Sequence, residues 1–517
     1  MLMTSALSSI SLYTWLLIAS CRLPAGCHAI SSASSSGGQA PLFVLLLDGL
    51  RWDYPLDSNL TGFSRLRQRG ASVLPLRPVY PSLCLPNIYS MFTGVYPHHH
   101  GLVGNENYDP SLDAIFNKSS PGLMSLLHTE LGVETLWDSL SRVGRRSLLY
   151  YLPGCAYSGN YGPSVCARPY RTMAPLEEVQ SALLEGAKSM RNGYADLVVL
   201  YVDLLDWGGH RFGPESATNR RRLLRQIDVL VSLATKQIVD SDWGASAGAH
   251  LLVIGDHGMS GVVKADRADL QNFAKHSDVL RVVHVGAAVG VWPVPGKNQS
   301  LWQMMQLMQS QHPHVEVLTD AQLISRFYPR VANQPEQPAV SARLPPISLL
   351  AEPGIFVETF HRHYPSYSSG PAKGWHGYDP VAKDMHTAVL VAGPLVQPGK
   401  LLSNATIGFD AVESLDVYPL MRRLLGLKDS EQHYRNRIWR RQSSSRLLSD
   451  LLLRADDGDP ASGIERKHND ESAALMLDRL NAKSPTSGAE SVICRSSSSS
   501  SAAAILLLMT LQLVFEL

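Results

Sequence analysis

Four runs of apolar residues, each about as long as one strand, recur along the chain with little polar alternation. A continuous apolar run of this length is typical of a strand that is buried on both faces of a sheet. Each run ends at, or shortly before, an aspartate or a glycine. The runs cover residues 42–47, 195–202, 250–255 and 387–392.

Stretches with a helical period lie between these strands. Apolar residues recur at helical spacing over 132–143 and over 221–239. Strands that alternate with helices predict an α/β domain with a mostly parallel sheet and helices on both faces. Ligands of such sheets gather at the carboxyl ends of the strands, so aspartates that follow the strands are expected to converge there.

The folded part is expected to span residues 41–427, because both flanks differ from it in composition. An apolar run at 10–19, followed by small and polar residues up to Ala29, is typical of a signal peptide over 1–29. Residues 428–495 are charged and serine-rich, which favours a stalk that need not pack. A serine run and an apolar end at 496–517 favour a glycosylphosphatidylinositol attachment signal over a marginal tail anchor. The expected location is therefore the extracellular face of the cell membrane, through a lipid anchor.

Composition and charge change this picture little. Of 517 residues, 45% are hydrophobic and 18% are charged, which indicates a folded protein, and the formal net charge is +1. Nucleic acid is not an expected partner, because no clustered basic surface is evident before residue 435. The basic segment 435–446 is interpreted first as a solvated helix or processing segment, and second as a contact for an anionic surface.

The expected signal peptide implies an oxidising compartment. The cysteines and the possible glycan acceptors are consistent with such a compartment. Two of the six cysteines would leave with the signal peptide, and Cys155 and Cys166 form the natural disulfide pair of a Gly- and Pro-containing loop. Cys84 is left unpaired, and Cys494 either leaves with the tail or bridges two copies as a homodimer. Possible glycan acceptors are Asn59, Asn117, Asn298 and Asn404.

Cys84 lies in the segment 80–87, Tyr-Pro-Ser-Leu-Cys-Leu-Pro-Asn. Pro81 and Pro86 restrict the backbone on both sides, which predicts a short rigid turn that holds the thiol in one direction, as a nucleophile is held. On this segment alone, the alternative is a small buried hydrophobic residue, which is what most free cysteines are.

Three aspartates and three histidines lie at or near the predicted strand ends. Oxygen and imidazole ligands suit zinc, and six are too many for one tetrahedral site but suit two, as in phosphoryl transfer. Taken singly, each could be a capped turn or a hydrogen-bonded histidine. His98, His99 and His100 are expected in a solvated turn. The six are Asp48, Asp206, His210, Asp256, His257 and His376.

Seven motifs together resemble the ectonucleotide pyrophosphatase/phosphodiesterase family of the alkaline phosphatase superfamily, over about residues 41–427. They are DGLRWDY from Asp48, YPSLCLPN from Tyr80, TGVYP from Thr93, GN from Gly104, DxxxH from Asp206, DHGM from Asp256 and GWHGYD from Gly374. The resemblance implies an alkaline-phosphatase-like α/β core, mostly parallel with helices on both faces. It also implies a phosphodiesterase with two zinc ions per subunit.

The resemblance further implies a role for each site residue. Asn105 would hold a phosphate oxygen, and Cys84 occupies the position of the nucleophile, shared with the second metal site. The zinc ligands would be Asp206, His210 and His376 for one ion, and Asp48, Asp256 and His257 for the other.

Cys84 departs from the family, in which the nucleophile is threonine or serine. A thiolate forms readily beside zinc and could attack phosphorus through a phosphocysteine. Sulfur also binds zinc tightly, so a weakly active or silent cell-surface homologue is an alternative. A sulfatase would need Cys-x-Pro-x-Arg, and Ile88 stands where that arginine is required.

The substrate expected from the resemblance is a choline phosphodiester. Segments 151–155, 292–297 and 327–328 are most similar to the choline-specific branch, which implies glycerophosphocholine or lysophosphatidylcholine as substrate and phosphocholine as product. Tyr151 and Tyr201 match its aromatic pocket, with His376 also against the substrate. The acidic residue of that pocket is expected at position 156, where this chain has Ala156. Nucleotides are the main rival substrates, and sphingomyelin-like lipids the next.

Overall fold

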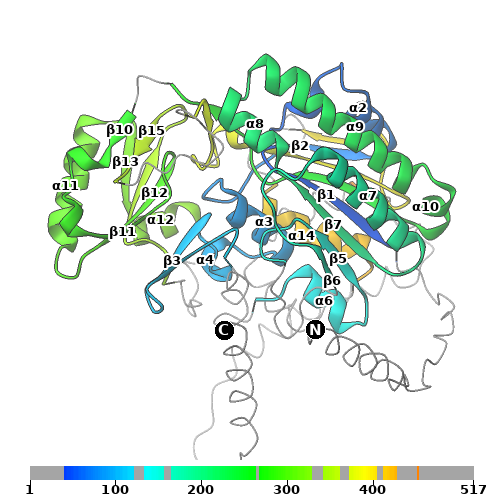
Figure 1. The fold of residues 1–517 in the computed structure, drawn as a ribbon, viewed down its shortest axis with the longest axis horizontal. Helices are drawn as coiled ribbons and strands as arrows, with labels where there is room; N and C mark the ends of the chain where they lie inside the picture. Colours follow the sequence, from blue (N-terminus) through cyan, green and yellow to red (C-terminus); the bar gives the residue numbers. More distant parts are fainter. Residues whose placement is uncertain are drawn as a thin grey trace, which may run out of the picture. The chain divides into compact units, whose positions relative to one another are not determined.

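Figure 1 shows the computed structural model, which describes residues 40–120, 133–155, 165–263, 267–328, 342–360, 372–403, 412–427 and 451–452. The chain divides into two compact units, Met1–Leu453 and Arg454–Leu517. All described residues belong to the first unit. The predicted signal peptide and attachment signal, and all but two residues of the predicted stalk, lie outside the described residues.

An eight-stranded sheet forms the larger part of the fold, in the order β18-β2-β17-β8-β1-β7-β5-β6. β1 is central and pairs in parallel with β7 and β8. Of these eight strands only β17 runs against its neighbours, so the predicted mostly parallel sheet is confirmed. The bounds are β1 Leu42–Leu47, β2 Ala71–Leu76, β5 Ser147–Tyr150, β6 Val165–Arg168, β7 Leu197–Val202, β8 His250–Gly255, β17 Thr387–Ala392 and β18 Leu401–Ser403.

The four predicted strands are β1, β7, β8 and β17, and only β7 differs in its bounds, beginning two residues later than predicted. The direction of β17 was not predicted. The chain enters β17 from the loop of His376, whose imidazole lies near the residues that follow β7 and β8. The strand therefore runs away from the edge where β1 ends, and the glycine after it lies at the opposite edge.

Helices lie on both sides of the sheet in Figure 1. α2 (Thr61–Arg69) and α9 (Leu224–Ala234) lie on one side, and α3 (Cys84–Thr93), α6 (Leu136–Arg142) and α14 (Val417–Leu424) on the other. The predicted helix at 221–239 belongs to a continuous helical segment, in which π-helical turns flank α9. The predicted helix at 132–143 begins later, at a capping box made by Thr135 and Asp138.

A second, antiparallel sheet was missed by the sequence analysis. Its order is β11-β12-β14-β13, and it has a hydrophobic cluster of its own that includes Met305, Leu349 and Trp375. Polar residues interrupt β11 and β13, and β12 contains a glycine and ends on a proline, so this sheet has a weaker strand signal than the first four runs. The elements are β11 Val279–Val283, β12 Ala288–Pro293, β13 Val315–Thr319 and β14 Ile347–Ala351, with α11 Asn298–Gln311 and α12 Asp320–Phe327.

Three smaller features concern the predicted disulfide, the candidate glycan acceptors and the lengths of the helices. The predicted disulfide Cys155–Cys166 is present. Asn59, Asn117 and Asn298 are exposed, as glycan acceptors must be, and Asn404 lies outside the described residues. Within the described part of the chain, no helix is both long and apolar enough to cross a bilayer.

Two residues of the predicted stalk are packed. Leu451 and Leu452 are buried in the main core, and the Leu451 carbonyl accepts a hydrogen bond from the Gln397 N–H at 2.9 Å. The apolar pair therefore packs although the segment around it is charged and serine-rich. The packed part of the first unit reaches residue 452, beyond the predicted end at 427.

The predicted solvated turn at the three consecutive histidines is wrong. His98, His99 and His100 form the short helix α4 (Pro97–His100), and all three side chains are buried. The ring of His98 packs on Tyr328, with centroids 4.3 Å apart, and its two nitrogens have no hydrogen-bond partner among the described residues. The sequence pattern showed three polar residues but not the aromatic surroundings that bury them.

Because these three histidines are buried, the free energy of unfolding is expected to fall in acid. Burial lowers the pKa of His98 to about 2, of His99 to about 4 and of His100 to about 3. The unfolded chain binds these protons near pH 6.5 and the folded chain does not, so stability is constant above that pH and falls below it. The expected loss is about 1.4 kcal/mol per pH unit for each histidine.

A His98→Phe variant isolates one of these protons. Its free energy of unfolding is expected to fall less than that of the wild type between pH 7.5 and 5.5, by about 1 kcal/mol. Urea unfolding at both values measures the difference. An equal loss in the two proteins would show that His98 takes up its proton in the folded state.

Candidate active site

Strand register brings three aspartates to one edge of the main sheet. Leu47, the last residue of β1, lies level with Val202 of β7 and with Gly255 of β8. Asp48 and Asp256 follow directly. Asp206 follows on the first turn of α8 (Leu204–Phe212), where its N–H donates to the Asp48 carbonyl at 3.1 Å. The predicted convergence of the three carboxylates is confirmed.

Gly49 allows this close approach. Its φ is 73°, and a Cβ there would lie 2.8 Å from the Asp206 Cα, closer than two carbons can stand. The Gly49 N–H donates to Asp256 Oδ1 at 3.1 Å. A glycine is therefore required for the loop after β1 to lie against both carboxylate-bearing segments.

The first donor group consists of Asp206, His210 and His376, whose ligand atoms lie within 4.8 Å of one another. Asp206 Oδ1 is 3.3 Å from His210 Nε2 and 3.4 Å from His376 Nε2. The Nδ1 atoms lie 2.9 Å from the Gly374 carbonyl and 3.0 Å from the Ser82 carbonyl, respectively. These contacts place the ring hydrogens on Nδ1 and leave the Nε2 lone pairs toward Asp206.

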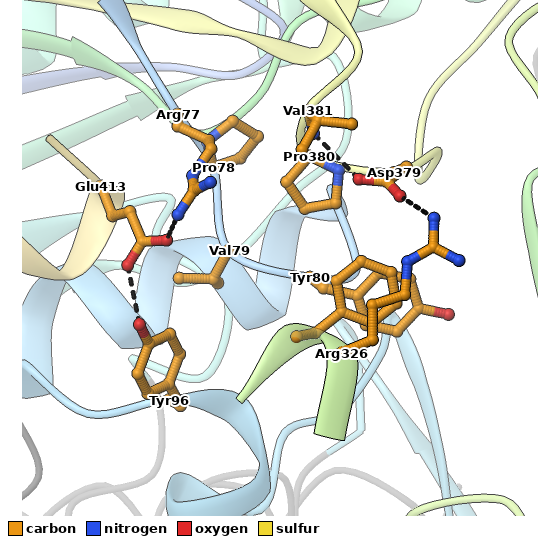
Figure 2. Close-up of a pocket in the computed structure, with 11 residues that line it drawn as sticks. Arg77, Pro78, Val79, Tyr80, Tyr96, Arg326, Asp379, Pro380, Val381 and Glu413 are labelled. Atoms are coloured by element: carbon orange, nitrogen blue, oxygen red, sulfur yellow. Dashed lines mark hydrogen bonds and ion pairs between the residues drawn. The ribbon is translucent and has the colours of Figure 1, made fainter. Parts of the chain in front are cut away.

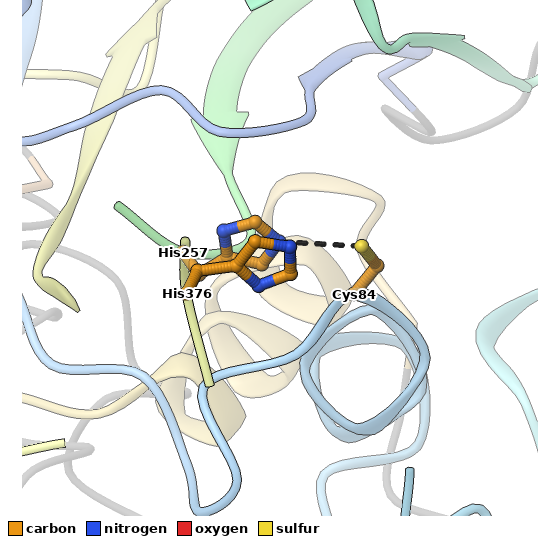
Figure 3. Close-up of side chains that lie close together, drawn as sticks. All are labelled: Cys84, His257 and His376. Carbon is orange, nitrogen blue, oxygen red and sulfur yellow. Dashed lines mark hydrogen bonds between the residues drawn. The ribbon is translucent and has the colours of Figure 1, made fainter. Parts of the chain in front are cut away.

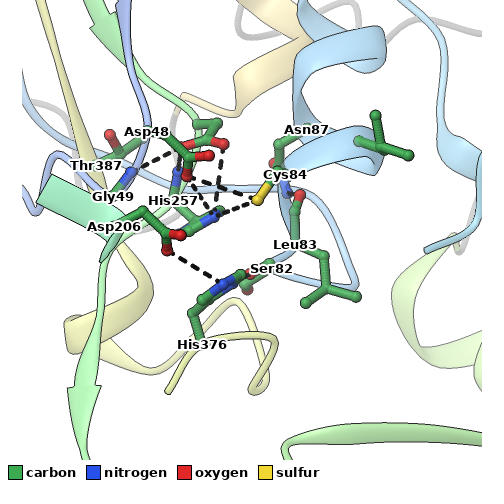
Figure 4. A network of polar contacts seen from close by, with 12 residues as sticks. Asp48, Gly49, Ser82, Leu83, Cys84, Asn87, Asp206, His257, His376 and Thr387 are labelled. Carbon is green, nitrogen blue, oxygen red and sulfur yellow. Dashed lines mark hydrogen bonds and ion pairs between the residues drawn. The ribbon is translucent and has the colours of Figure 1, made fainter. Parts of the chain in front are cut away.

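The second donor group consists of Asp48, Cys84, Asp256 and His257, again within 4.8 Å of one another (Figure 4). His257 Nε2 is 3.2 Å from Cys84 Sγ, 3.2 Å from Asp48 Oδ1 and 3.5 Å from Asp256 Oδ2. The two groups adjoin, because the rings of His257 and His376 stack with centroids 3.7 Å apart (Figure 3).

Both groups fit divalent cations. All seven side chains are buried, and Asp206 Oδ1 and Asp256 Oδ2 accept no hydrogen bond from any described residue. Burial, and then the neighbouring Asp48 charge, raise the pKa of Asp256 to about 7. Carboxylate oxygens and imidazole lone pairs that face one another in a buried site are costly unless a cation lies between them. Carboxylate, imidazole and thiolate are common ligands of such cations.

Cys84 is held at the start of α3. The Asn87 side-chain amide donates to three carbonyls of the preceding segment, at Val79, Pro81 and Leu83, and this fixes the predicted rigid turn. Asn105 Oδ1 accepts from the Leu85 N–H at 3.0 Å, which leaves its Nδ2 directed at Cys84 Sγ, 3.5 Å away. Asn105 therefore lies beside Cys84, and its role in holding a phosphate oxygen stays a prediction.

Ser82 is turned away from this site. Its hydroxyl donates to the Tyr378 carbonyl at 2.8 Å, so it cannot replace Cys84. Burial, and then the Asp48 charge, raise the pKa of the Cys84 thiol to about 12. A bound cation would act in the opposite direction, because positive charge favours the thiolate.

Lys118 also reaches this site, and the sequence analysis missed it. Its Nζ lies 3.3 Å from Asp48 Oδ2 and 3.4 Å from Tyr201 Oη. The Asp48 carboxylate and the Tyr201 hydroxyl are themselves hydrogen-bonded. None of the seven family motifs contains this lysine, which is the middle residue of the possible glycan-acceptor sequence at Asn117, and its position depends on a hairpin that was not predicted.

The two tyrosines of the expected choline pocket have different surroundings. Tyr201 lies at the site, with the Tyr170 ring centroid 6.2 Å away. The Tyr151 hydroxyl instead accepts from Arg168 Nη1 at 3.1 Å. Asp203 lies at the end of β7, and its carboxylate accepts from the Met173 N–H at 2.9 Å. Ala156 lies outside the described residues.

A separate cavity of about 360 Å³ lies beside Tyr80, and none of the seven donor residues lines it (Figure 2). Its walls include the stacked rings of Tyr80 and Phe327, with centroids 3.9 Å apart, and the ion pair between Arg326 and Asp379 at 2.5 Å. These side chains satisfy one another. The cavity therefore lies beside the segment that carries Cys84, and its walls add no ligand to the site.

Comparison with known families identifies the class of the protein. The family model described as type I phosphodiesterase / nucleotide pyrophosphatase matches residues 42–379. This match covers more than half of the chain and includes every donor residue above. The chain therefore belongs to this family and is a phosphoric diester hydrolase, as its motifs predicted.

Individual relatives support the same family assignment. Bis(5'-adenosyl)-triphosphatase enpp4 from Mus musculus is 26% identical over 407 residues, covering 76% of this chain and 80% of the relative. Ectonucleotide pyrophosphatase/phosphodiesterase family member 7 from Homo sapiens is 24% identical over 421 residues, covering 76% and 81%. The structure of murine ectonucleotide pyrophosphatase/phosphodiesterase 5 matches with a TM-score of 0.65 at 21% identity, covering 80% of this chain and 100% of that one. This likeness shows the same fold.

Proposed function

We propose that this protein is a two-zinc phosphodiesterase in which the Cys84 sulfur attacks phosphorus. The observation that carries the proposal is the position of the sulfur, 3.2 Å from His257 Nε2 and 3.6 Å from Asp48 Oδ1, inside a buried metal-ligand group. Asp206, His210 and His376 would hold one ion, and Asp48, Asp256 and His257 the other. Zinc would supply the positive charge that stabilises the attacking and leaving atoms.

In this proposal, hydrolysis takes two steps, attack by the Cys84 sulfur and then attack by water. The Cys84 sulfur forms a bond to phosphorus as the bond to the leaving oxygen breaks, and the leaving oxygen takes up a proton. Water then attacks phosphorus, the sulfur–phosphorus bond breaks, and the thiolate is restored. Asn105 Nδ2, directed at the sulfur, is placed to donate a hydrogen bond to a phosphate oxygen in both steps.

The substrates we propose first are nucleotide phosphodiesters. The charge of Lys118 beside Asp48 and Tyr201 favours an anionic substrate. The murine relative is named a bis(5'-adenosyl)-triphosphatase, and one solved structure of murine member 5, an inactive variant, contains AMP. Choline phosphodiesters, the substrates expected from the resemblance to the choline-specific branch, are the second candidate. The Tyr170 and Tyr201 rings and the nearby Asp203 carboxylate favour them.

Two chromogenic substrates separate these candidates. The wild-type protein is expected to hydrolyse thymidine 5'-monophosphate p-nitrophenyl ester with kcat/KM at least about tenfold above that for p-nitrophenylphosphorylcholine. Glycerophosphocholine and lysophosphatidylcholine serve as the natural choline substrates, with the release of phosphocholine as the readout. A preference for the choline esters would overturn the nucleotide assignment, and hydrolysis of neither class would favour the silent homologue.

We also propose that the protein acts at the extracellular face of the cell membrane through a glycosylphosphatidylinositol anchor. The Cys155–Cys166 disulfide and the three exposed acceptor asparagines support an extracellular location. Release from intact cells by phosphatidylinositol-specific phospholipase C tests the anchor, and retention after that treatment would contradict it. The Cys494-bridged homodimer stays a prediction, because that residue lies outside the described part of the chain.

A further inference from the structure

We propose that Lys118 determines the charge of the substrates that this site accepts, favouring a second anionic group and excluding a cationic head group. This inference rests on the proposed function, because it concerns the same site. The ammonium contacts Asp48 Oδ2 at 3.3 Å and Tyr201 Oη at 3.4 Å, and it lies 6.0 Å from the centre of the Tyr201 ring. The Lys118 side chain keeps 18% of its surface exposed, whereas Asp48 is fully buried.

The hairpin of β3 (Glu106–Asp109) and β4 (Ala114–Asn117) explains how a residue outside the seven family motifs reaches the site. Glu106 pairs with Asn117, so the residues just outside this pair, Asn105 and Lys118, leave the open end of the hairpin together. Asn105 Nδ2 is directed at the Cys84 sulfur, and Lys118 Nζ at the Asp48 carboxylate. One hairpin therefore places an amide and an ammonium beside the atoms that act on phosphorus.

The balance of charge indicates what this ammonium does. Three carboxylates and a thiolate would balance two divalent cations, which leaves the charge of Lys118 available to a substrate. Asp203 opposes it in part, because this carboxylate lies two residues along the chain from Tyr201, whose hydroxyl the ammonium contacts. A trimethylammonium group on the Tyr170 and Tyr201 rings would lie near a like charge, which disfavours it. A nucleotide with a further phosphate would gain from the same charge.

Paired substrates and variants test this assignment. The ratio of kcat/KM for ATP to that for p-nitrophenylphosphorylcholine is expected to fall at least about tenfold in Lys118→Met and to recover in Lys118→Arg. Asp203→Asn, which removes the opposing charge, is expected to raise the ratio. The exposed Lys236 gives the matched control, Lys236→Met, in which the ratio stays at the wild-type value. An equal change for both substrates in Lys118→Met would overturn the inference.

A binding measurement separates this inference from the proposed function. In a Cys84→Ala background, calorimetry is expected to show that Lys118→Met weakens ADP at least about tenfold while phosphocholine binds as well as before or more tightly. Equal ADP affinity with and without Lys118 would overturn the inference, even if the wild type were active. A wild type that hydrolyses no phosphodiester would overturn the proposed function, and the binding result would still decide the role of Lys118.

Discussion

Replacement of Cys84 by alanine is expected to lower kcat for phosphodiester hydrolysis by about 10⁴-fold or more. The variant keeps the aspartates and histidines that lie around the sulfur but removes the atom that would bond to phosphorus. Steady-state rates with thymidine 5'-monophosphate p-nitrophenyl ester measure the effect. Because Cys84 is buried at the start of α3, a thermal unfolding curve should accompany each rate to show that the variant is folded.

Cys84→Thr is the matched variant, because threonine or serine holds this position in the family that the motifs resemble. It is expected to retain hydrolysis, since its hydroxyl can occupy the position of the sulfur and be activated by the same neighbours. Full activity in Cys84→Ala would contradict the nucleophile assignment. Loss of activity in both variants, with folding intact, would show that the site requires sulfur in particular.

Removal of metal is expected to abolish hydrolysis and to lower the melting temperature. Without cations, the buried carboxylates and imidazoles of the two donor groups face one another with no intervening positive charge. Dialysis against a chelator, followed by addition of zinc, should remove and restore both activity and stability. Unchanged activity in protein shown to be free of metal would contradict the two-zinc account.

Substitution of one metal-ligating residue tests the number of bound zinc ions. Asp206→Asn is expected to reduce the zinc content from two ions per chain to one and to lower kcat/KM by at least about 100-fold. The exposed Asp242 provides the control, Asp242→Asn, which should keep both ions and full activity. Two ions retained in Asp206→Asn would show that this carboxylate does not hold a metal.

The main sheet could be predicted because its strands carry their signal locally. β1, β8 and β17 are continuous apolar runs, and burial on both faces leaves few other structures for such runs. The direction of β17 could not be predicted, because it depends on where the preceding loop must deliver His376. The second sheet was missed because polar residues interrupt β11 and β13, which both have a mixed burial pattern.

The donor residues were predictable for the same reason. Asp48 and Asp256 follow strands that pair with each other in register, so sequence position alone determined that they would meet. Lys118 was not predictable, because it reaches the site through the pairing of a surface hairpin. His98 was not predictable either, since its burial depends on Tyr328, more than two hundred residues away in the sequence.

The most direct test of the account is the mass of the peptide that contains Cys84 during turnover. The protein should be mixed with thymidine 5'-monophosphate p-nitrophenyl ester, quenched with acid and digested for mass spectrometry. A thymidylyl group on the Cys84 sulfur, absent in Cys84→Ala and lost as turnover ends, is the predicted result. Turnover without an adduct on that peptide, or with an adduct on another residue, would contradict the assignment of Cys84 as the nucleophile.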